Sequence, residues 1–323
     1  MEIIRRLSDI RALKNPVVTI GNFDGVHLGH RQIFRKLKKA AADLDGVSVV
    51  MTFIPHPLKV LPSGKSLRLI NTYEEKELLI EASGIDYLVV IPFTEQFAAI
   101  SAREFVSGVL VRDIGMKKLI IGYDYAFGRN REGNVELLCQ LGIEYGFAVE
   151  VLEPIGNGQT LYSSTNIRKM IGNGNVREVV TLLGRHFSIG GKVVHGHHRG
   201  KGLGFPTANL ETDKELIPKS GVYAVKVGID QMRYDGACNI GPNPTFAEEA
   251  ISIEVFIFDF AGDLYGRELR IYFIDRIRDE RRFPDAAALQ RAIEDDVARC
   301  REALRDTAII EYRDYLGKDD CVQ

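Results

Sequence analysis

Short apolar runs alternate with polar loops and amphipathic helical stretches over residues 17–152, and this alternation is the strongest constraint on the fold. The runs are VVTI, VSVVMTF, YLVVI, LII and VEVL. Strands that alternate with helices at this spacing form a parallel sheet, because each helix returns the chain to the same sheet edge. S/T-x-x-E capping boxes at residues 72–75 and 101–104 predict two of the helix starts. The sequence therefore predicts an α/β domain.

The pattern changes after about Leu183. Short alternating runs follow, SIGGKVV, GVYAVKVGI and ISIEVFIFDF, separated by Gly, Pro and Asn, which favours a mostly antiparallel β-barrel or sandwich. The end of the chain predicts one helix with Asp285 as N-cap, packed on the barrel. Its apolar stripe is Leu289, Ile293, Val297, Cys300 and Leu304. A length of 323 residues suits two cores, and we expect domains at 1–184 and 185–323.

Composition narrows the function classes. With 42 Lys+Arg against 44 Asp+Glu, the net charge of -2 disfavours nucleic acid as a partner. No stretch of eighteen apolar residues exists, and the charged start MEIIRRLSDIR does not resemble a signal peptide. The four cysteines form no CxxC pair and indicate reduced thiols. These features predict a cytoplasmic protein, a monomer or weak homo-oligomer, that binds small molecules and no membrane.

The segment GNFDGVHLGH, residues 21–30, follows the run VVTI and precedes a helix expected to begin near His30 or Arg31. This is the carboxyl edge of a parallel sheet beside a helix N-terminus, where α/β folds bind phosphates. His27 and His30 can share one face of the first turn, while Gly25 and Gly29 let a nucleotide approach the backbone. A turn with two helix-capping histidines is the alternative. The flanking FDG favours the phosphate site.

A second segment, YSSTNIR at residues 162–168, places hydroxyl groups before a predicted helix. Ser163, Ser164 and Thr165 can hold phosphate oxygens, and Arg168 can bind them bidentately. Alone, the segment would be an ordinary N-cap. Together with the two histidines it indicates adenylyl transfer, in which the protein positions the reactants and stabilises charge without a covalent step.

These segments and FIPHP at residues 53–57 resemble the bacterial bifunctional riboflavin kinases/FMN adenylyltransferases, also called FAD synthetases, and the similarity spans nearly the whole chain. The resemblance implies a nucleotidyltransferase domain with His27, His30 and Arg168 as catalytic residues. The implied ATP-binding residues are Gly21, Phe23, His27, Gly29, His30, Ser164, Thr165 and Arg168. The implied flavin-binding residues are Asn22, Phe53, Pro55, His56, Pro57 and Asp124. In GYDYAFG, residues 122–128, Tyr125 replaces the usual Phe of the family.

A third segment, RGKGLGFPTANL at residues 199–210, predicts a second nucleotide site. Its glycines and cations can wrap ATP phosphates, and the Thr207 hydroxyl and Asn209 amide are hard oxygen ligands suited to Mg²⁺. A solvated turn is the alternative. With GKVV at 191–194 and DLYG at 263–266, the segment resembles a riboflavin kinase barrel. The implied ATP-binding residues are Gly200, Lys201, Gly202, Gly204, Thr207 and Asn209.

Glu254 is the candidate base of the second site. Strict alternation in ISIEVFIFDF predicts one face with Ile251, Ile253, Val255 and Ile257 and the opposite face with Ser252, Glu254, Phe256 and Phe258, so that two phenyl rings would flank the carboxylate. The resemblance places the catalytic glutamate of the kinase at this position. An exposed strand charge is the alternative. The group His195-Gly-His197-His198 suggests zinc, but no Cys is near and Arg199 and Lys201 would repel a metal ion.

The sequence therefore predicts a transferase that phosphorylates riboflavin to FMN and then adenylylates FMN to FAD, releasing pyrophosphate, with ATP as co-substrate and Mg²⁺. One alternative is a single-activity FMN adenylyltransferase whose barrel binds flavin without catalysis. A second, suggested by the similarity of HLGH to the HIGH motif of class I tRNA synthetases, would need a KMSKS-like loop and a basic surface, and the sequence has neither. A flavin-sensing regulator is the third.

Overall fold

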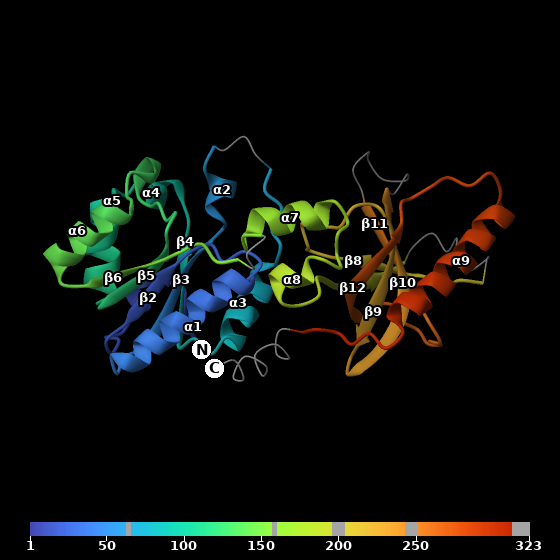
Figure 1. Cartoon of the computed structure of the whole chain (residues 1–323), viewed down its shortest axis with the longest axis horizontal. Coiled ribbons are helices and arrows are strands. Elements are labelled where there is room, and N and C mark those ends of the chain that lie inside the picture. Colours follow the sequence, from blue (N-terminus) through green and yellow to red (C-terminus); the bar gives the residue numbers. More distant parts are fainter. Residues whose placement is uncertain (63–65, 157–159, 196–203, 243–250, 312–323) are drawn as a thin grey trace. The chain divides into compact units, whose positions relative to one another are not determined.

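The computed structural model describes residues 1–62, 66–156, 160–195, 204–242 and 251–311 (Figure 1). The chain divides into two compact units, Met1–Ser164 and Thr165–Gln323. The second unit thus begins before Gly184, where the sequence pattern changes, and includes two short helices ahead of the barrel.

The first unit contains a six-stranded sheet in which every pairing is parallel, in the order β1-β4-β3-β2-β5-β6. The strands are β1 Glu2–Ile4, β2 Val17–Ile20, β3 Ser48–Ile54, β4 Tyr87–Pro92, β5 Lys118–Gly122 and β6 Ala148–Leu152. The five predicted strands are confirmed. The sequence did not reveal β1, since only one of its three residues is buried and it has no alternating pattern to read.

The helices of the first unit lie between these strands. They are α1 Leu28–Asp43, α2 Pro57–Val60, α3 Tyr73–Ala82, α4 Glu95–Ala98, α5 Ala102–Glu104 and α6 Val135–Tyr145. A π-helix at Phe105–Asp113 and 3-10 turns at Leu7–Asp9 and Arg129–Arg131 complete the helical elements in the described part of the first unit. Both predicted capping boxes form, at Thr72 and at Ser101. Helix α1 begins at Leu28, earlier than predicted, because the His27 side chain caps it.

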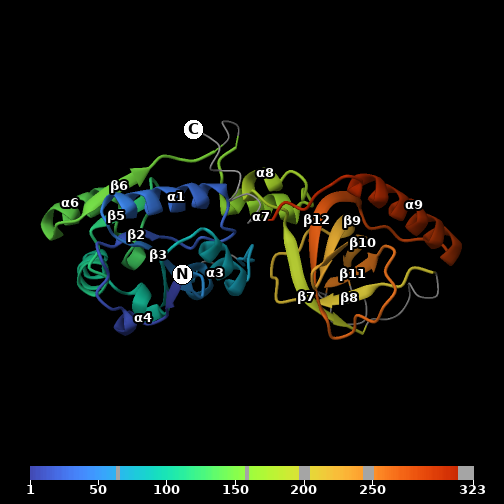
Figure 2. The ribbon, with the colours of Figure 1, turned by 90° about the horizontal axis from the view of Figure 1, so that it is seen from below.

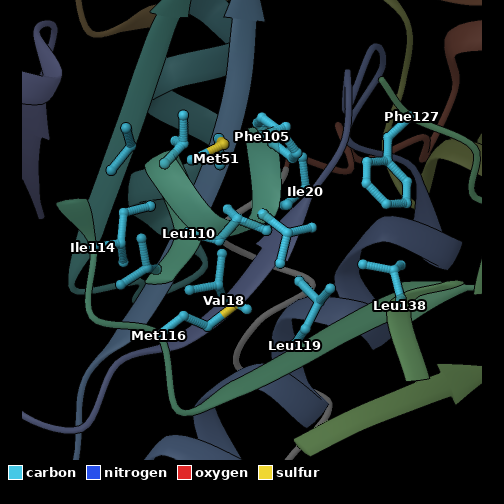
Figure 3. Close-up of a cluster of buried hydrophobic side chains, with 14 of the residues drawn as sticks. Val18, Ile20, Met51, Phe105, Leu110, Ile114, Met116, Leu119, Phe127 and Leu138 are labelled. Atoms are coloured by element: carbon cyan, nitrogen blue, oxygen red, sulfur yellow. The ribbon is translucent and has the colours of Figure 1, made fainter. Parts of the chain in front are cut away.

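The core of the first unit lies where the π-helix, α6 and α5 meet one face of the sheet (Figure 3). Val18, Met51 and Leu119 come from three neighbouring strands, and Leu110 and Leu138 come from the covering helices. All five are fully buried. This packing fixes the strands whose carboxyl ends carry the predicted site residues.

The second unit is a closed barrel in the order β10-β11-β8-β7-β12-β9, with antiparallel neighbours (Figure 2). The strands are β7 Ser188–Val194, β8 Ala208–Glu211, β9 Gly221–Ile229, β10 Met232–Pro242, β11 Ile251–Ile257 and β12 Glu268–Arg278. The unit's helices are α7 Ser164–Gly172, α8 Val180–Leu183 and α9 Ala286–Leu304. The predicted barrel is confirmed.

Helix α9 packs against β9, β10 and β12, as predicted from its stripe. Cys300 and Leu304 join Phe258 and Ile274 in one apolar cluster. The Asp285 carboxylate caps the helix by accepting a hydrogen bond from the backbone N–H of Ala288 at 2.7 Å. The barrel therefore has a covered outer face.

Candidate functional site

The loop between β2 and α1 has an unusual backbone. Phe23 and Val26 adopt φ angles of 48° and 37°, and Gly25 lies at 88°. Left-handed backbone is rare for a β-branched residue such as Val26 and persists only where the surrounding structure holds it. Phe23 and Val26 are buried, so packing supplies that support.

The two predicted histidines lie together. Their rings stack with centroids 3.6 Å apart and an interplanar angle of 21°. The backbone N–H of His30 donates to Nδ1 of His27 at 3.4 Å. A neutral His27 that accepts at Nδ1 carries its proton on Nε2, which makes that atom a donor suited to a phosphate oxygen. Capping and phosphate binding are therefore compatible roles for one imidazole.

Asp24 ties this loop to two distant segments. Its buried carboxylate accepts hydrogen bonds from the backbone N–H groups of Ile70 and Asn71, at 3.0 Å and 3.3 Å. Its carbonyl accepts a hydrogen bond from the Ser164 hydroxyl at 2.8 Å. The structure thus brings Ser164 to the predicted phosphate loop. Thr165 and Arg168 belong to α7 in the second unit.

The predicted flavin-binding residues follow strands whose carboxyl ends share one sheet edge. Asn22 follows β2, and Pro55 follows β3 after a cis peptide bond from Ile54. His56 is buried, and its Nδ1 accepts from the backbone N–H of Leu58 at 3.1 Å. Asp124 follows β5 and is exposed. The parallel order places the ends of β2, β3 and β5 side by side.

Aromatic rings gather near the end of β3. The Phe53 ring lies 5.6 Å from that of Phe93 and 6.0 Å from that of Phe97. Tyr125 stacks on Phe127 with centroids 5.5 Å apart, and burial raises the pKa of its hydroxyl. Such rings offer apolar surface suited to a planar heteroaromatic molecule.

Two residues of α3 that the sequence did not single out also contact this edge. The Tyr73 hydroxyl accepts a hydrogen bond from the backbone N–H of His56 at 3.1 Å. Lys76 is only 5% exposed, and its Nζ donates to Thr52 Oγ1 at 3.0 Å. Burial lowers the pKa of Lys76 to about 8. A lysine near a helix start normally faces water, so no sequence signal marked it.

In the barrel, strand pairing assembles the second site. Glu254 on β11 lies opposite Asn209 on β8 and Asn239 on β10. The Thr207 hydroxyl donates to Glu254 Oε2 at 3.4 Å. The structure therefore brings together three of the residues predicted for the second site: Thr207, Asn209 and Glu254.

The alternation predicted for β11 is confirmed from Ile253 to Ile257, whereas Ile251, the first residue of the strand, is exposed. Ile253, Val255 and Ile257 are buried, whereas Glu254 and Phe256 on the opposite face are half-buried. Phe258 follows the strand and is buried in the cluster under α9. The Phe256 ring contacts both Phe205, with centroids 5.4 Å apart, and Phe258, with centroids 5.6 Å apart.

A cavity of about 380 Å³ adjoins this site. Thr207 lies at its boundary, and His195 stacks on Tyr265 in its wall with ring centroids 3.9 Å apart. The predicted segment DLYG supplies Asp263, Leu264 and Tyr265 to the lining. The volume lies in the range of small-ligand sites.

Some predicted residues lie outside the described part of the chain, namely Gly200, Lys201 and Gly202 of the kinase ATP loop and His197 and His198 of the rejected zinc group. Gly204 is described and adopts a φ of 86°. Among the described residues, no group of three or more His, Cys, Asp or Glu side chains could hold a metal ion.

A loop at the carboxyl edge of a parallel sheet and a carboxylate–hydroxyl–amide cluster on a barrel are arrangements suited to a two-domain phosphate-transfer enzyme. The FAD synthetase family model matches residues 9–166, and the riboflavin kinase model matches residues 183–304. The chain belongs to the family of bifunctional riboflavin kinases/FMN adenylyltransferases, as the resemblance predicted.

Curated relatives support this assignment. The bifunctional riboflavin kinase/FMN adenylyltransferase of Buchnera aphidicola subsp. Acyrthosiphon pisum is 36% identical over 301 residues, 92% of this chain and 96% of that protein. The Escherichia coli K12 protein of the same name is 36% identical over 305 residues, 94% of this chain and 97% of that protein.

A solved structure matches nearly the whole chain as well. It is described as a macrolide-efflux protein from Streptococcus pneumoniae, is 34% identical, covers 93% of this chain and 98% of that one, and has a TM-score of 0.84. That description concerns the other protein. In the described part of this chain, no helix is long and apolar enough to cross a membrane.

Proposed function

We propose that this chain catalyses two ATP-dependent transfers in series. In the first, the 5′-hydroxyl of riboflavin attacks the γ-phosphorus of ATP, giving FMN and ADP. In the second, a phosphate oxygen of FMN attacks the α-phosphorus of ATP, giving FAD and pyrophosphate. The observation that carries the proposal is the presence of two separate constellations, the stacked His27–His30 pair and the Thr207–Glu254 contact. The matches to both family models favour it over a single-activity adenylyltransferase.

For the adenylyl transfer, the imidazoles of His27 and His30 donate to the triphosphate as charge builds on the α-phosphate. Arg168 clamps the phosphate oxygens bidentately. The other ATP-binding residues are Gly21, Phe23, Gly29, Ser164 and Thr165. The flavin contacts Asn22, Phe53, Pro55, His56, Pro57 and Asp124. The aromatic rings at the end of β3 support the flavin assignment.

For the phosphorylation, Glu254 accepts the proton of the riboflavin hydroxyl. Thr207 and Asn209 would hold Mg²⁺, which would neutralise charge on the ATP phosphates. Two neutral oxygen ligands fit this ion, which usually keeps several waters and binds substrate phosphates as well. Gly204, together with Gly200, Lys201 and Gly202, wraps the phosphates. The stacked His195 and Tyr265 make the adjoining cavity suited to a purine.

We further assign the adenylyltransferase domain to residues 1–184 and the kinase domain to residues 185–323. We also infer that the protein is cytoplasmic, binds no nucleic acid and no membrane, and is a monomer or weak homo-oligomer. The balanced charge supports only the inference about nucleic acid. Size-exclusion chromatography with light scattering measures the oligomeric state.

Chromatography of riboflavin, ATP and Mg²⁺ incubated with the protein tests the proposal. FMN and then FAD should form. His30→Ala should slow FAD formation roughly a hundred- to a thousandfold and leave FMN to accumulate. Glu254→Ala should slow riboflavin phosphorylation by roughly a hundred- to ten-thousandfold yet still convert supplied FMN. Identical defects in both variants would contradict separate sites.

A further inference from the structure

Lys76 is a buried cation beneath the loop that carries the histidines. Besides its bond to Thr52 Oγ1, its Nζ donates to the carbonyl oxygen of Asn22 at 3.4 Å. The Thr52 hydroxyl donates to the same carbonyl at 3.3 Å. The Tyr73 ring lies under the ammonium group, 5.4 Å from Nζ to the centroid. Lysine is almost never this buried without paired groups. The ammonium group thus joins the ends of β2 and β3 to α3.

A second buried charge lies on the same loop. Asp24 is only 5% exposed. Its negative charge raises the pKa of Lys76, whereas burial lowers it. A carboxylate buried beside a loop that binds ATP would repel the triphosphate if nothing offset it. The Lys76 ammonium contributes positive charge that acts on this carboxylate. Removing the cation would take away one buried positive charge that acts on this carboxylate.

We propose that Lys76 is a positioning residue for adenylyl transfer, holding the Asn22 carbonyl and offsetting the Asp24 carboxylate so that the loop binds the ATP phosphates. The inference rests on the role proposed above for His27 and His30. Lys76 acts through the loop and does not contact the reacting atoms. Its loss should therefore weaken ATP binding more than it slows the chemical step.

The protonation of Lys76 gives this role a pH dependence. Burial lowers its pKa to about 8, while the charges of Asp24 and Glu77 oppose the shift. The ammonium form is thus present at pH 7 and is lost as the pH rises through about 8. At pH 9 about a tenth of the molecules keep the charge, and the apparent KM for ATP should rise roughly tenfold if only the charged form binds well.

The wild-type enzyme provides the first test. The KM for ATP in FMN adenylylation, measured with Mg²⁺ at pH 7 and pH 9, should rise roughly tenfold. The KM for ATP in riboflavin phosphorylation by the same preparation serves as the internal control and should not follow this rise. A flat KM for adenylylation across this range would overturn the proposal.

Variants provide the second test. Lys76→Met should raise the KM for ATP in adenylylation at pH 7 by roughly tenfold or more and remove its pH dependence. Lys39→Met is the matched control, because Lys39 is exposed on α1 and pairs with Asp43. Thr52→Val removes one partner of the ammonium and should move the rise in KM to lower pH. If thermal unfolding shows that Lys76→Met does not fold, the Thr52→Val variant replaces it as the test of the proposal.

A fall in kcat at unchanged KM in Lys76→Met would refute the electrostatic role. His30→Ala separates this inference from the proposed function. If His30→Ala abolishes FAD formation while Lys76→Met leaves the KM unchanged, only the inference about Lys76 fails. If His30→Ala forms FAD at the wild-type rate, the assignment of the adenylylation site itself fails.

Discussion

The two proposed sites are built in opposite ways. The loop between β2 and α1 comes from one continuous segment whose backbone is left-handed at Phe23, Gly25 and Val26. The barrel site combines residues of β11 and β8 with Thr207, the residue before β8. The pairing of Glu254 with Asn209 joins the two strands. The first therefore depends on a backbone shape held by packing, and the second on strand register. Substitutions should affect the two sites through different mechanisms.

Gly29→Ala tests the dependence of the first site on backbone shape. An added Cβ would lie 3.1 Å from the His27 ring and 3.3 Å from the Tyr162 Cβ. Contacts this short require the His27 ring to move by a few tenths of an ångström, so FAD formation should slow, though by less than the roughly hundredfold that a misplacement of 1 Å costs. Gly29 is the second residue of α1, and alanine is a better helix former than glycine, so activity should fall more than stability. Steady-state assays of both reactions measure the effect.

Gly108→Ala is the matched control for that experiment, because the nearest atoms to an added Cβ there belong to the Arg112 guanidinium, 3.7 Å away. It should leave both activities unchanged. If Gly29→Ala keeps wild-type FAD formation, the loop tolerates displacement and the contrast between the two sites fails.

Asp296→Ala tests the barrel. Asp296 on α9 accepts from Arg278 Nε at 2.8 Å and from its Nη2 at 2.7 Å, and its side chain is 7% exposed. Leaving the guanidinium unpaired should lower the free energy of unfolding of the second unit by about 3 kcal/mol. Calorimetry should show a lower Tm for the second unit and an unchanged Tm for the first unit.

The double variant Arg278→Met/Asp296→Leu sharpens that result. Replacing both charges by apolar side chains of similar size should restore most of the lost stability, because no unpaired charge remains. A single variant with wild-type stability would show that α9 does not depend on this ion pair.

The smallest effect concerns pH. Burial lowers the pKa of His186, whose Nδ1 accepts from the backbone N–H of Ile310 at 2.9 Å. The His186 imidazole therefore binds a proton less readily in the folded state than in the unfolded state. Its neutral form adds to the free energy of unfolding above about pH 6.5, and this contribution is lost as the pH falls below that value. The Tm of the second unit should drop between pH 7.5 and pH 5.5.

His186→Asn is the corresponding control, since an amide oxygen can accept from Ile310 without titrating. Its Tm should depend less on pH than that of the wild type. An equal pH dependence in the two proteins would assign the effect to other groups.

Much of the first site was readable because its residues are adjacent in sequence. GNFDGVHLGH predicted the histidines, their loop and the helix that follows, and only the start of α1 was placed too late. The sequence could not show that His27 both caps the helix and stacks on His30. That arrangement depends on side-chain rotamers, which a spacing does not specify.

Residues that support the site from a distance were missed for a different reason. Lys76 and Tyr73 belong to a helix that the Thr72 capping box predicts, yet the pattern alone gives a solvent-facing charge. Their contacts with Thr52 and His56 exist because α3 packs at the ends of β2 and β3. Long-range packing of this kind leaves no local sequence signal.

The sequence by itself determined the two fold classes and most strand positions, because apolar periodicity and turn residues act over a few positions. It also showed that one domain carries a histidine loop and the other a strand with a candidate catalytic carboxylate. The tertiary structure alone decided the burial of Lys76 beside Asp24 and the approach of Thr207 to Glu254. These contacts join residues far apart in the chain, and only the packed fold sets their distance and the dielectric environment between them.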